Sequence, residues 1–525
     1  MSWYLLVEAG LILLLCALTR FLFLHGSTSD TWVELWLIRK FVDGDGDVTR
    51  PSDSVVDGIY GRPFLLNWFL SRFPERYWQV LGTAVNIGAD LCLVIVVYAL
   101  TFVLHGQPLV TGPFSFAGWT ALLTGLTPLY HPINSRLRGC FKTRSTGTWL
   151  AFLSVACMWL AVELHVLWSF PSMLLFVLTL LTSQFGTQIV VFFLVIMSFW
   201  TGSLLPVGVL AGTCLVLWWC SDWFRVFVRW KLGHFSWYFF QQRNVSPTER
   251  KNRLRDLFAL PLRLFRDPVL AYRDIAQTHT ITALLYLFPA GAVLLVVLGM
   301  VLVQGGFPDA IGNTGPLQAF SWYMAGAAGI AFVITSVYPF LFLGEAERYV
   351  EPSVPFVTFL FMVGVQRGHV AEPFLSIVLL WGLVVVLLNF IFIGSDGFEQ
   401  TLLPEDPDAL LELVQFLNGK EGNVLTIPLK YSCKISSHLP EDGLNFLIRG
   451  IQHPEGGKQW HEDIRHEEHH SYPHERLQEI VDRFEIDYLI VNRTELEERS
   501  FSYSFSAFSN VFQNNEFAVY RVKDT

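Results

Sequence analysis

Long apolar runs constrain this chain more than any other feature of its sequence. The segments LLVEAGLILLLCALTRFLFL and IVLLWGLVVVLLNFIFI reach or approach the roughly 20 residues that an α-helix needs to cross a bilayer. Only 15% of the residues are charged, whereas soluble domains carry about 25%. The sequence predicts a mainly α, polytopic membrane protein with about ten spans, give or take two, near 3–24, 78–104, 114–130, 148–168, 171–200, 203–221, 278–303, 318–343, 353–366 and 373–395.

Two of these runs are irregular. The 171–200 run is interrupted by TSQFGTQ, which is compatible with one broken helix or with two half-helices. The 353–366 run is short for a full crossing. The sequence therefore does not decide whether the number of crossings after residue 275 is even or odd.

The charge distribution separates a soluble C-terminal region from the apolar part. The whole chain has a net charge of −9, and 22 acidic against 12 basic residues lie between Gln400 and Thr525. An acidic tail argues against a nucleic-acid partner. Within the tail, DPDALLELVQFLN has helical spacing, and NVLTIPL, IDYLIVN and FAVYRV are typical of short strands. We therefore predict a membrane domain over 1–398 and a small soluble α/β domain over 399–525.

Basic residues predict the orientation of the membrane domain. Residues 222–275 contain eleven Lys or Arg against five acids, which favours a cytoplasmic segment. Counting back six spans places the 25–77 loop outside. Counting forward four spans places the tail inside, and an odd number of crossings would place it outside. The stretch WFRVFVRWKLGHFSWYFF at 223–240 is typical of an amphipathic helix at the membrane interface.

The first loop begins with carboxylates close to the end of the first span. Asp30 and Glu34 in STSDTWVELWLI are spaced i, i+4, so a helix would place both on one face. A charged interfacial helix and the acid/base end of an active site both fit this pattern. The DGDGDV stretch that follows lacks the later ligands of a calcium loop and favours a turn.

Three further segments carry candidate substrate contacts next to apolar runs. Tyr60 and Arg62 lie in IYGRPFLLNWFLSRFP, where an arginine at the membrane surface can bind a phosphate or simply extend to the interface. The 131–147 loop is strongly basic although the span count places it outside. FLGEAERYVEPSVPF packs charges against the bilayer, which marks function or pairing. The candidate residues of these last two segments are Arg136, Arg138, Lys142, Arg144, Glu345, Arg348 and Tyr349.

These segments together resemble the GT-C superfamily of polytopic glycosyltransferases, which includes protein O-mannosyltransferases and aminoarabinose transferases. SDTWVELWLI resembles the family's acidic first external loop, and IYGRPFLLNWFLSRFP resembles its YPP segment, with Gly61-Arg62 where the first proline is usual. EAERYVEP is similar to a late E-x-RY-x-x-P element. LLTSQFGTQ looks like the family's LLTSK-AAQ segment, with Gln184 in place of lysine.

The resemblance implies inverting transfer of a hexosyl or pentosyl group from a polyprenyl-phosphate sugar to a lipid, glycan or protein acceptor. It implies a multi-pass protein of the plasma (inner) membrane, surrounded by lipid. Asp30 would be the general base, and Glu34 would orient it or bind acceptor or metal. Arg62, Arg136, Arg138 and Arg348, or a divalent metal ion, would stabilise the leaving phosphate.

Other functions stay open from the sequence alone. An O-antigen-type polymerase or ligase would rely on basic external loops and tolerate loss of Asp30. A lipid-linked sugar transporter or flippase would place charges in mid-span and contain an internal repeat, which the sequence lacks. A metalloprotease would use the HEEHH match at His466 and His470, but its flanks are polar and Pro473 follows closely.

Overall fold

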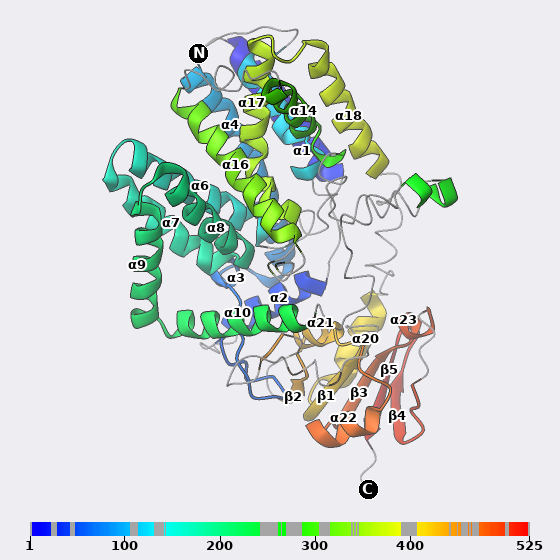
Figure 1. Cartoon of the computed structure of the whole chain (residues 1–525). Coiled ribbons are helices and arrows are strands. Elements are labelled where there is room, and N and C mark those ends of the chain that lie inside the picture. Colours follow the sequence, from blue (N-terminus) through cyan, green and yellow to red (C-terminus); the bar gives the residue numbers. More distant parts are fainter. Residues whose placement is uncertain are drawn as a thin grey trace. The chain divides into compact units, whose positions relative to one another are not determined.

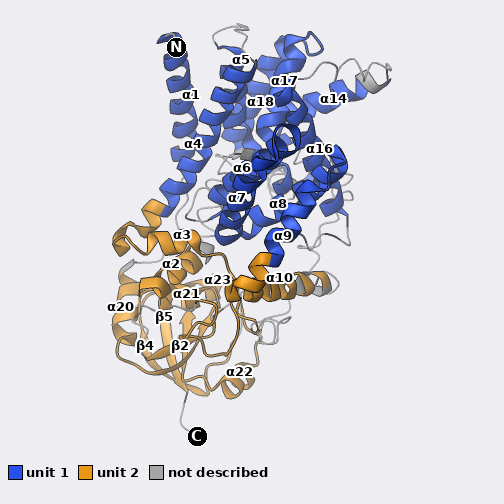
Figure 2. Cartoon of the chain, turned by 90° about the vertical axis from the view of Figure 1, so that its left-hand side faces the viewer, with its two compact units in different colours: residues 1–26, 82–215, 251–397 blue, residues 27–81, 216–250, 398–525 orange. Residues whose placement is uncertain are grey.

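The chain folds into two compact units in the computed structural model (Figure 1, Figure 2). Unit 1 contains residues 1–26, 82–215 and 251–397, and unit 2 contains residues 27–81, 216–250 and 398–525. The described residues are 3–22, 29–42, 48–105, 114–130, 141, 143–241, 261–263, 265–268, 286–303, 315–337, 340, 343, 346–389, 407–439, 443–448, 450–452, 460, 464, 472–498 and 503–522. Unit 2 thus combines the first loop, part of the basic segment and the tail.

Unit 1 is a helix bundle, as the apolar runs predict. Every predicted span coincides with at least one helix among the residues that the structure describes. The helices are α1 (Trp3–Leu22), α4 (Trp78–His105, which starts in unit 2), α5 (Phe116–Leu126), α6 (Arg144–Glu163), α7 (Ser169–Thr182), α8 (Gln184–Thr201), α9 (Leu205–Cys220), α14 (Pro289–Val303), α16 (Pro316–Ser336), α17 (Val354–Gln366) and α18 (Pro373–Asn389).

Length and composition divide these helices into classes. Within the described residues, five stretches are long and apolar enough to cross a membrane: Trp3–Phe21, Glu75–Leu104, Arg144–Glu163, Gln184–Thr201 and Pro316–Ser336. A sixth span results if the pair Leu205–Cys220 and Asp222–Ser236, bent by 115°, counts as one. The chain is therefore a multi-pass, mainly helical protein.

The two irregular runs have local explanations. The 171–200 run forms two helices, because Ser183 leaves the helical conformation and its hydroxyl accepts a hydrogen bond from the Gly186 amide at 3.2 Å, capping α8. The 353–366 run forms α17, in which every residue from Val354 to Val363 is buried. A helix that is apolar on all sides and buried by its neighbours needs no lipid contact to explain its composition.

Unit 2 is built around a mixed five-stranded sheet in the tail. The strand order is β2-β1-β3-β5-β4, in which β2, β1 and β3 are parallel and β5 and β4 are antiparallel additions (Figure 1). The strands are β1 (Gly422–Ile427), β2 (Leu444–Phe446), β3 (Tyr488–Asn492), β4 (Phe508–Gln513) and β5 (Phe517–Val522). The helices of this unit are α2 (Ser29–Val42), α3 (Leu65–Leu70), α10 (Asp222–Gln241), α20 (Pro407–Leu417), α21 (Tyr431–Ser436), α22 (Leu477–Phe484) and α23 (Arg493–Glu498).

The first loop is part of the tail's hydrophobic core. Trp36 and Leu37 of α2, together with Val56 and Tyr60, pack into one buried cluster with side chains of the sheet and of α20, α21 and α22. The loop also extends the β2 edge, where the Val55 amide donates to the Phe446 carbonyl at 3.1 Å. Backbone pairing and apolar burial together hold the loop on the tail.

Candidate functional site

Two of the predicted site residues meet in a buried contact within unit 2. The Arg62 Nη2 atom lies 3.3 Å from Glu34 Oε1, although the two residues are 28 positions apart in the chain. Asn67 of α3 donates from Nδ2 to Glu34 Oε2 at 2.8 Å and to the Glu34 carbonyl at 3.0 Å. Glu34 is only 2% exposed, so its carboxylate is compensated by an arginine and an amide rather than by water.

Tyr60 completes this group, called the Arg62 cluster below (Glu34, Tyr60, Arg62 and Asn67). Arg62 Nη1 lies 3.4 Å from the Tyr60 hydroxyl oxygen, and the Tyr60 ring packs edge-on against Trp36 and Trp230. Burial raises the pKa of Tyr60 above its usual value, against the opposing effect of Arg62. The phenol is therefore protonated at neutral pH and accepts from Arg62. The Arg62 side chain is 21% exposed, so one side of the cluster opens to the surface.

The glycine before Arg62 is required by a close helix contact. A Cβ atom at Gly61 would lie 2.7 Å from Trp230 Cβ and 2.9 Å from Phe227 Cα, both in α10. The proline that is usual at this place in the resembling family would not fit against the α10 backbone. The substitution at Gly61 is thus explained by packing within unit 2.

The helix α10 is bonded to the tail as well. Trp230 Nε1 donates to the Gly450 carbonyl at 3.0 Å, and Gln452 Nε2 donates to the Trp230 carbonyl at 2.7 Å. Segments in direct hydrogen-bond contact lie on the same side of a bilayer. The predicted placements, outside for 25–77 and cytoplasmic for 222–275, are therefore incompatible for residues 222–241.

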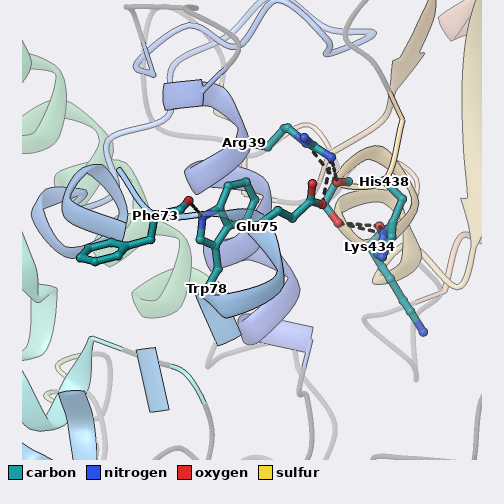
Figure 3. A network of polar contacts seen from close by, with 7 residues as sticks. Arg39, Phe73, Glu75, Trp78, Lys434 and His438 are labelled. Carbon is teal, nitrogen blue, oxygen red and sulfur yellow. Dashed lines mark hydrogen bonds and ion pairs between the residues drawn. The ribbon is translucent and has the colours of Figure 1, made fainter. Parts of the chain in front are cut away.

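Other polar contacts fix α2 on the tail. Lys40 Nζ lies 3.0 Å from Asp53 Oδ1 in a fully buried pair, and Asp53 Oδ2 accepts from Trp36 Nε1 and from Ser436 Oγ, each at 2.8 Å. Nearer the surface, Arg39 donates to Glu75 (Figure 3). Arg39 also donates to the Ser437 carbonyl. The helix α2, which carries Asp30, is therefore held by both apolar and charged contacts.

The catalytic candidate itself is placed by its backbone. Asp30 lies in the first turn of α2, and its side chain lies outside the described part of the structure. Arg136, Arg138, Lys142 and Glu345 lie outside the described residues, as do His466 and His470 of the protease-like match.

Unit 1 contains a second group of predicted residues, called the Arg144 cluster below (Arg144, Arg348, Tyr349 and Glu351). Arg144, at the start of α6, forms a buried ion pair with Glu351, and both it and Arg348 lie over the Phe185 ring, with the Arg144 Cζ atom 5.4 Å from the ring centre. The Tyr349 hydroxyl donates to the Leu343 carbonyl at 2.9 Å. Of the charges of EAERYVEP, Glu351 is thus paired with Arg144 and Arg348 lies over an aromatic ring within this unit.

Glu351, one of the charges of FLGEAERYVEPSVPF for which function or pairing is predicted, is paired with Arg144. Two other polar residues are not predicted from the sequence. Asn67 lies inside a motif whose other residues are predicted, and its polarity within an apolar segment is its only signal. Glu8 lies within the first span and is 4% exposed. Its carboxylate accepts from the Tyr98 hydroxyl at 2.7 Å and from the Ser115 amide and hydroxyl at 2.5 and 2.9 Å, at the start of α5. A carboxylate in a span is costly unless it is paired in this way.

No group of three or more His, Cys, Asp or Glu within the described residues has the arrangement of a metal site. No protein-family model matches the chain, and no curated protein does. Among solved structures, the chain is similar to ArnT from Cupriavidus metallidurans, whose crystal structure is bound to undecaprenyl phosphate.

The match to ArnT spans 99% of this chain and 98% of that chain, at 12% sequence identity and a TM-score of 0.48.

Proposed function

We propose that this protein is a GT-C-type membrane glycosyltransferase that uses a polyprenyl-phosphate-linked sugar donor. The observation that carries the proposal is the contact between Glu34 and Arg62, since it joins the acidic first-loop segment to the segment that resembles the YPP motif, at the place where this chain has Gly61-Arg62 instead of the first proline. Two neighbouring segments of the first loop that each resemble one enzyme family thus form one polar cluster. The multi-pass helical unit supplies the membrane environment that a polyprenyl donor requires.

Asp30 is the proposed general base of an inverting reaction. It removes the proton from the acceptor hydroxyl while the acceptor oxygen bonds to the anomeric carbon and the bond from that carbon to the phosphate oxygen breaks. Arg62 offers a planar pair of N–H donors to the departing phosphate. Glu34 and Tyr60 hold the Arg62 guanidinium in place. It therefore needs little movement when negative charge develops on the departing phosphate.

The active side of the membrane is proposed to be the outer face of the plasma (inner) membrane. Residues 27–81, the described part of α10 and the tail belong to one compact unit, and we propose that all three lie on this side. On this proposal α10 lies on the outer surface, and the later basic residues of 222–275 are outside with it, because no predicted span separates them from α10. Arg136, Arg138, Lys142, Arg144, Glu345, Arg348 and Tyr349 remain proposed substrate contacts.

The test is glycosyl transfer in vitro with synthetic polyprenyl-phosphate sugars. Asp30→Asn removes the base and should lower turnover by about two to four orders of magnitude. Asp482→Asn, at an exposed position of α22, is the matched control and should retain full activity. Wild-type turnover in Asp30→Asn would reject Asp30 as the base, and movement of the donor across vesicles without transfer would favour a flippase.

A further inference from the structure

The C-terminal end of the first span contains a buried arginine that none of the motifs includes. Arg20 of α1 is 0% exposed. Within the described residues, it forms no ion pair with a carboxylate. A guanidinium that is removed from water without a counter-charge is among the most costly groups in a membrane protein. Its compensation therefore requires an explanation.

One side of the guanidinium has a structural role. Arg20 Nη1 donates to the Gly125 carbonyl at 2.7 Å and lies 3.3 Å from the Cys16 carbonyl. Gly125 is in the last turn of α5, where carbonyls lack partners within the helix, so Arg20 caps that helix. The contact depends on close packing, because a Cβ atom at Gly125 would lie 2.3 Å from Cys16 Sγ.

The other side of the guanidinium makes no hydrogen bond to the described residues. Arg20 Nε and Nη2 are buried, and neither has a hydrogen-bond partner among the described residues. The hydrogens on Nε and Nη2 point in parallel, and this edge is the one that binds two oxygens of a phosphate or carboxylate. The contacts of Nη1 orient the guanidinium, and the bidentate Nε–Nη2 edge is not used by them.

From this geometry we propose that Arg20 binds a phosphate group of a membrane lipid through its Nε–Nη2 edge, and that this lipid is the polyprenyl-phosphate donor. Only eight residues separate Arg20 from Ser29, the first residue of the helix that carries Asp30. A donor phosphate at the end of α1 can therefore lie at the same membrane face as the start of that helix. Identification of the lipid as the donor rests on the proposed function, whereas the phosphate site does not.

The test measures ligand binding by the full-length protein in detergent. Farnesyl phosphate is the probe, and farnesol is its uncharged counterpart. Arg20→Gln should weaken farnesyl phosphate binding by about tenfold or more, because a charge-assisted bidentate contact is lost. Farnesol binding should not change. Arg476→Gln, at an exposed arginine of the tail, is the control and should bind farnesyl phosphate like wild type.

A second variant separates binding from folding. Arg20→Lys keeps the positive charge and one donor for the Gly125 carbonyl but lacks the bidentate edge. It should retain a melting temperature close to that of wild type and still lose affinity for farnesyl phosphate. Unchanged affinity in Arg20→Lys and Arg20→Gln would overturn the proposal. Equal losses for farnesol and farnesyl phosphate would also overturn it, since they would reveal a purely structural role.

Two further probes identify the source of the phosphate. Inorganic phosphate should compete weakly, because it lacks the lipid tail. Wild type and Arg20→Gln should have the same affinity for phosphatidylglycerol presented in nanodiscs. If phosphatidylglycerol alone depended on Arg20, the residue would serve an ordinary headgroup and the donor assignment would fall. If farnesyl phosphate binding depended on Arg20 but no sugar were transferred, the proposed function would fail and the phosphate site would stand.

Discussion

Glu34 and Arg62 illustrate how a buried ion pair can position a substrate-binding group. Glu34→Gln keeps the side-chain size and an acceptor for Asn67 but removes the charge opposite Arg62. We expect the KM for the donor to rise about tenfold, because Arg62 loses the carboxylate that positions it. The free energy of unfolding should fall by about 2 kcal/mol, less than for a fully buried pair, because the partly exposed Arg62 retains some hydration. Steady-state kinetics and thermal unfolding of the same preparations measure the two effects.

The matched comparison is an ion pair at the surface. Glu75→Gln removes the carboxylate that Arg39 contacts at 3.0 Å, but Glu75 is 53% exposed. Exposed pairs contribute about 0–1 kcal/mol, so this variant should have near-wild-type stability and donor KM. If Glu34→Gln and Glu75→Gln behaved alike, Glu34 would have no part in positioning Arg62.

At the residue scale, the sequence identified candidates but not their partners. Glu34 and Arg62 were both predicted as site residues from their neighbouring motifs. Their contact depends on how α2 and the segment before α3 pack, which no local pattern encodes. Asn67 was missed for the same reason, since an asparagine in LLNWFL has no distinctive signal until its partner is known.

The contact between α21 and α2 predicts a pH-dependent stability. Lys434 of α21 is 3% exposed, and its Nζ atom lies 4.8 Å from the centre of the Trp32 ring. Burial lowers the pKa of Lys434 from 10.5 to about 8, against the opposing effect of Glu516. Below pH 8 the lysine is charged in both folded and unfolded states, so the cost of burying the charge is fully present. As the pH rises from about 8 to 10.5, this cost disappears.

Lys434→Met should therefore stabilise the protein most at neutral pH. The variant keeps an unbranched apolar chain against Trp32 and removes the buried charge, for a gain of about 1–3 kcal/mol near pH 7. The difference in melting temperature between variant and wild type should shrink as the pH approaches 10.5. Lys420→Met, at a partly exposed lysine over Phe416, is the control and should show no such trend. A gain for Lys434→Met that did not change with pH would contradict the explanation.

At the element scale, hydrophobic patterns predict the longer strands and helices but not the short pairings at the edge of the sheet. The predicted strands at 423–429, 486–492 and 517–522 are confirmed as β1, β3 and β5, and the helix near 406–418 is confirmed as α20. The strand β2 has only three residues, and the first loop pairs with the tail through two isolated bridges, Ser54 with Phe446 of β2 and Ile59 with Gln452. Elements this short carry too few residues for an alternating pattern to be recognised.

The whole molecule makes a prediction about sidedness. Hydrogen bonds within unit 2 join the first loop, α10 and the tail, so all three should lie on one side of the membrane. The basic residues of 222–275 led to a different placement, because counting charges does not detect tertiary contacts. Single cysteines at Glu75, Arg229 and Arg476, introduced into a cysteine-free chain, place a reporter in each region.

A membrane-impermeant maleimide applied to intact cells should label all three positions, because the proposed function places unit 2 outside. Leu164→Cys, at the far end of α6, should be labelled only after permeabilisation, because the predicted spans 78–104, 114–130 and 148–168 separate it from Glu75. Protection of all three positions in intact cells would show that unit 2 faces the cytoplasm, and the proposed orientation would be wrong. The three regions would still lie on one side of the membrane. Labelling at Glu75 and protection at Arg229 would instead show that α10 and the first loop are separated by the bilayer, and the site as described here would be wrong.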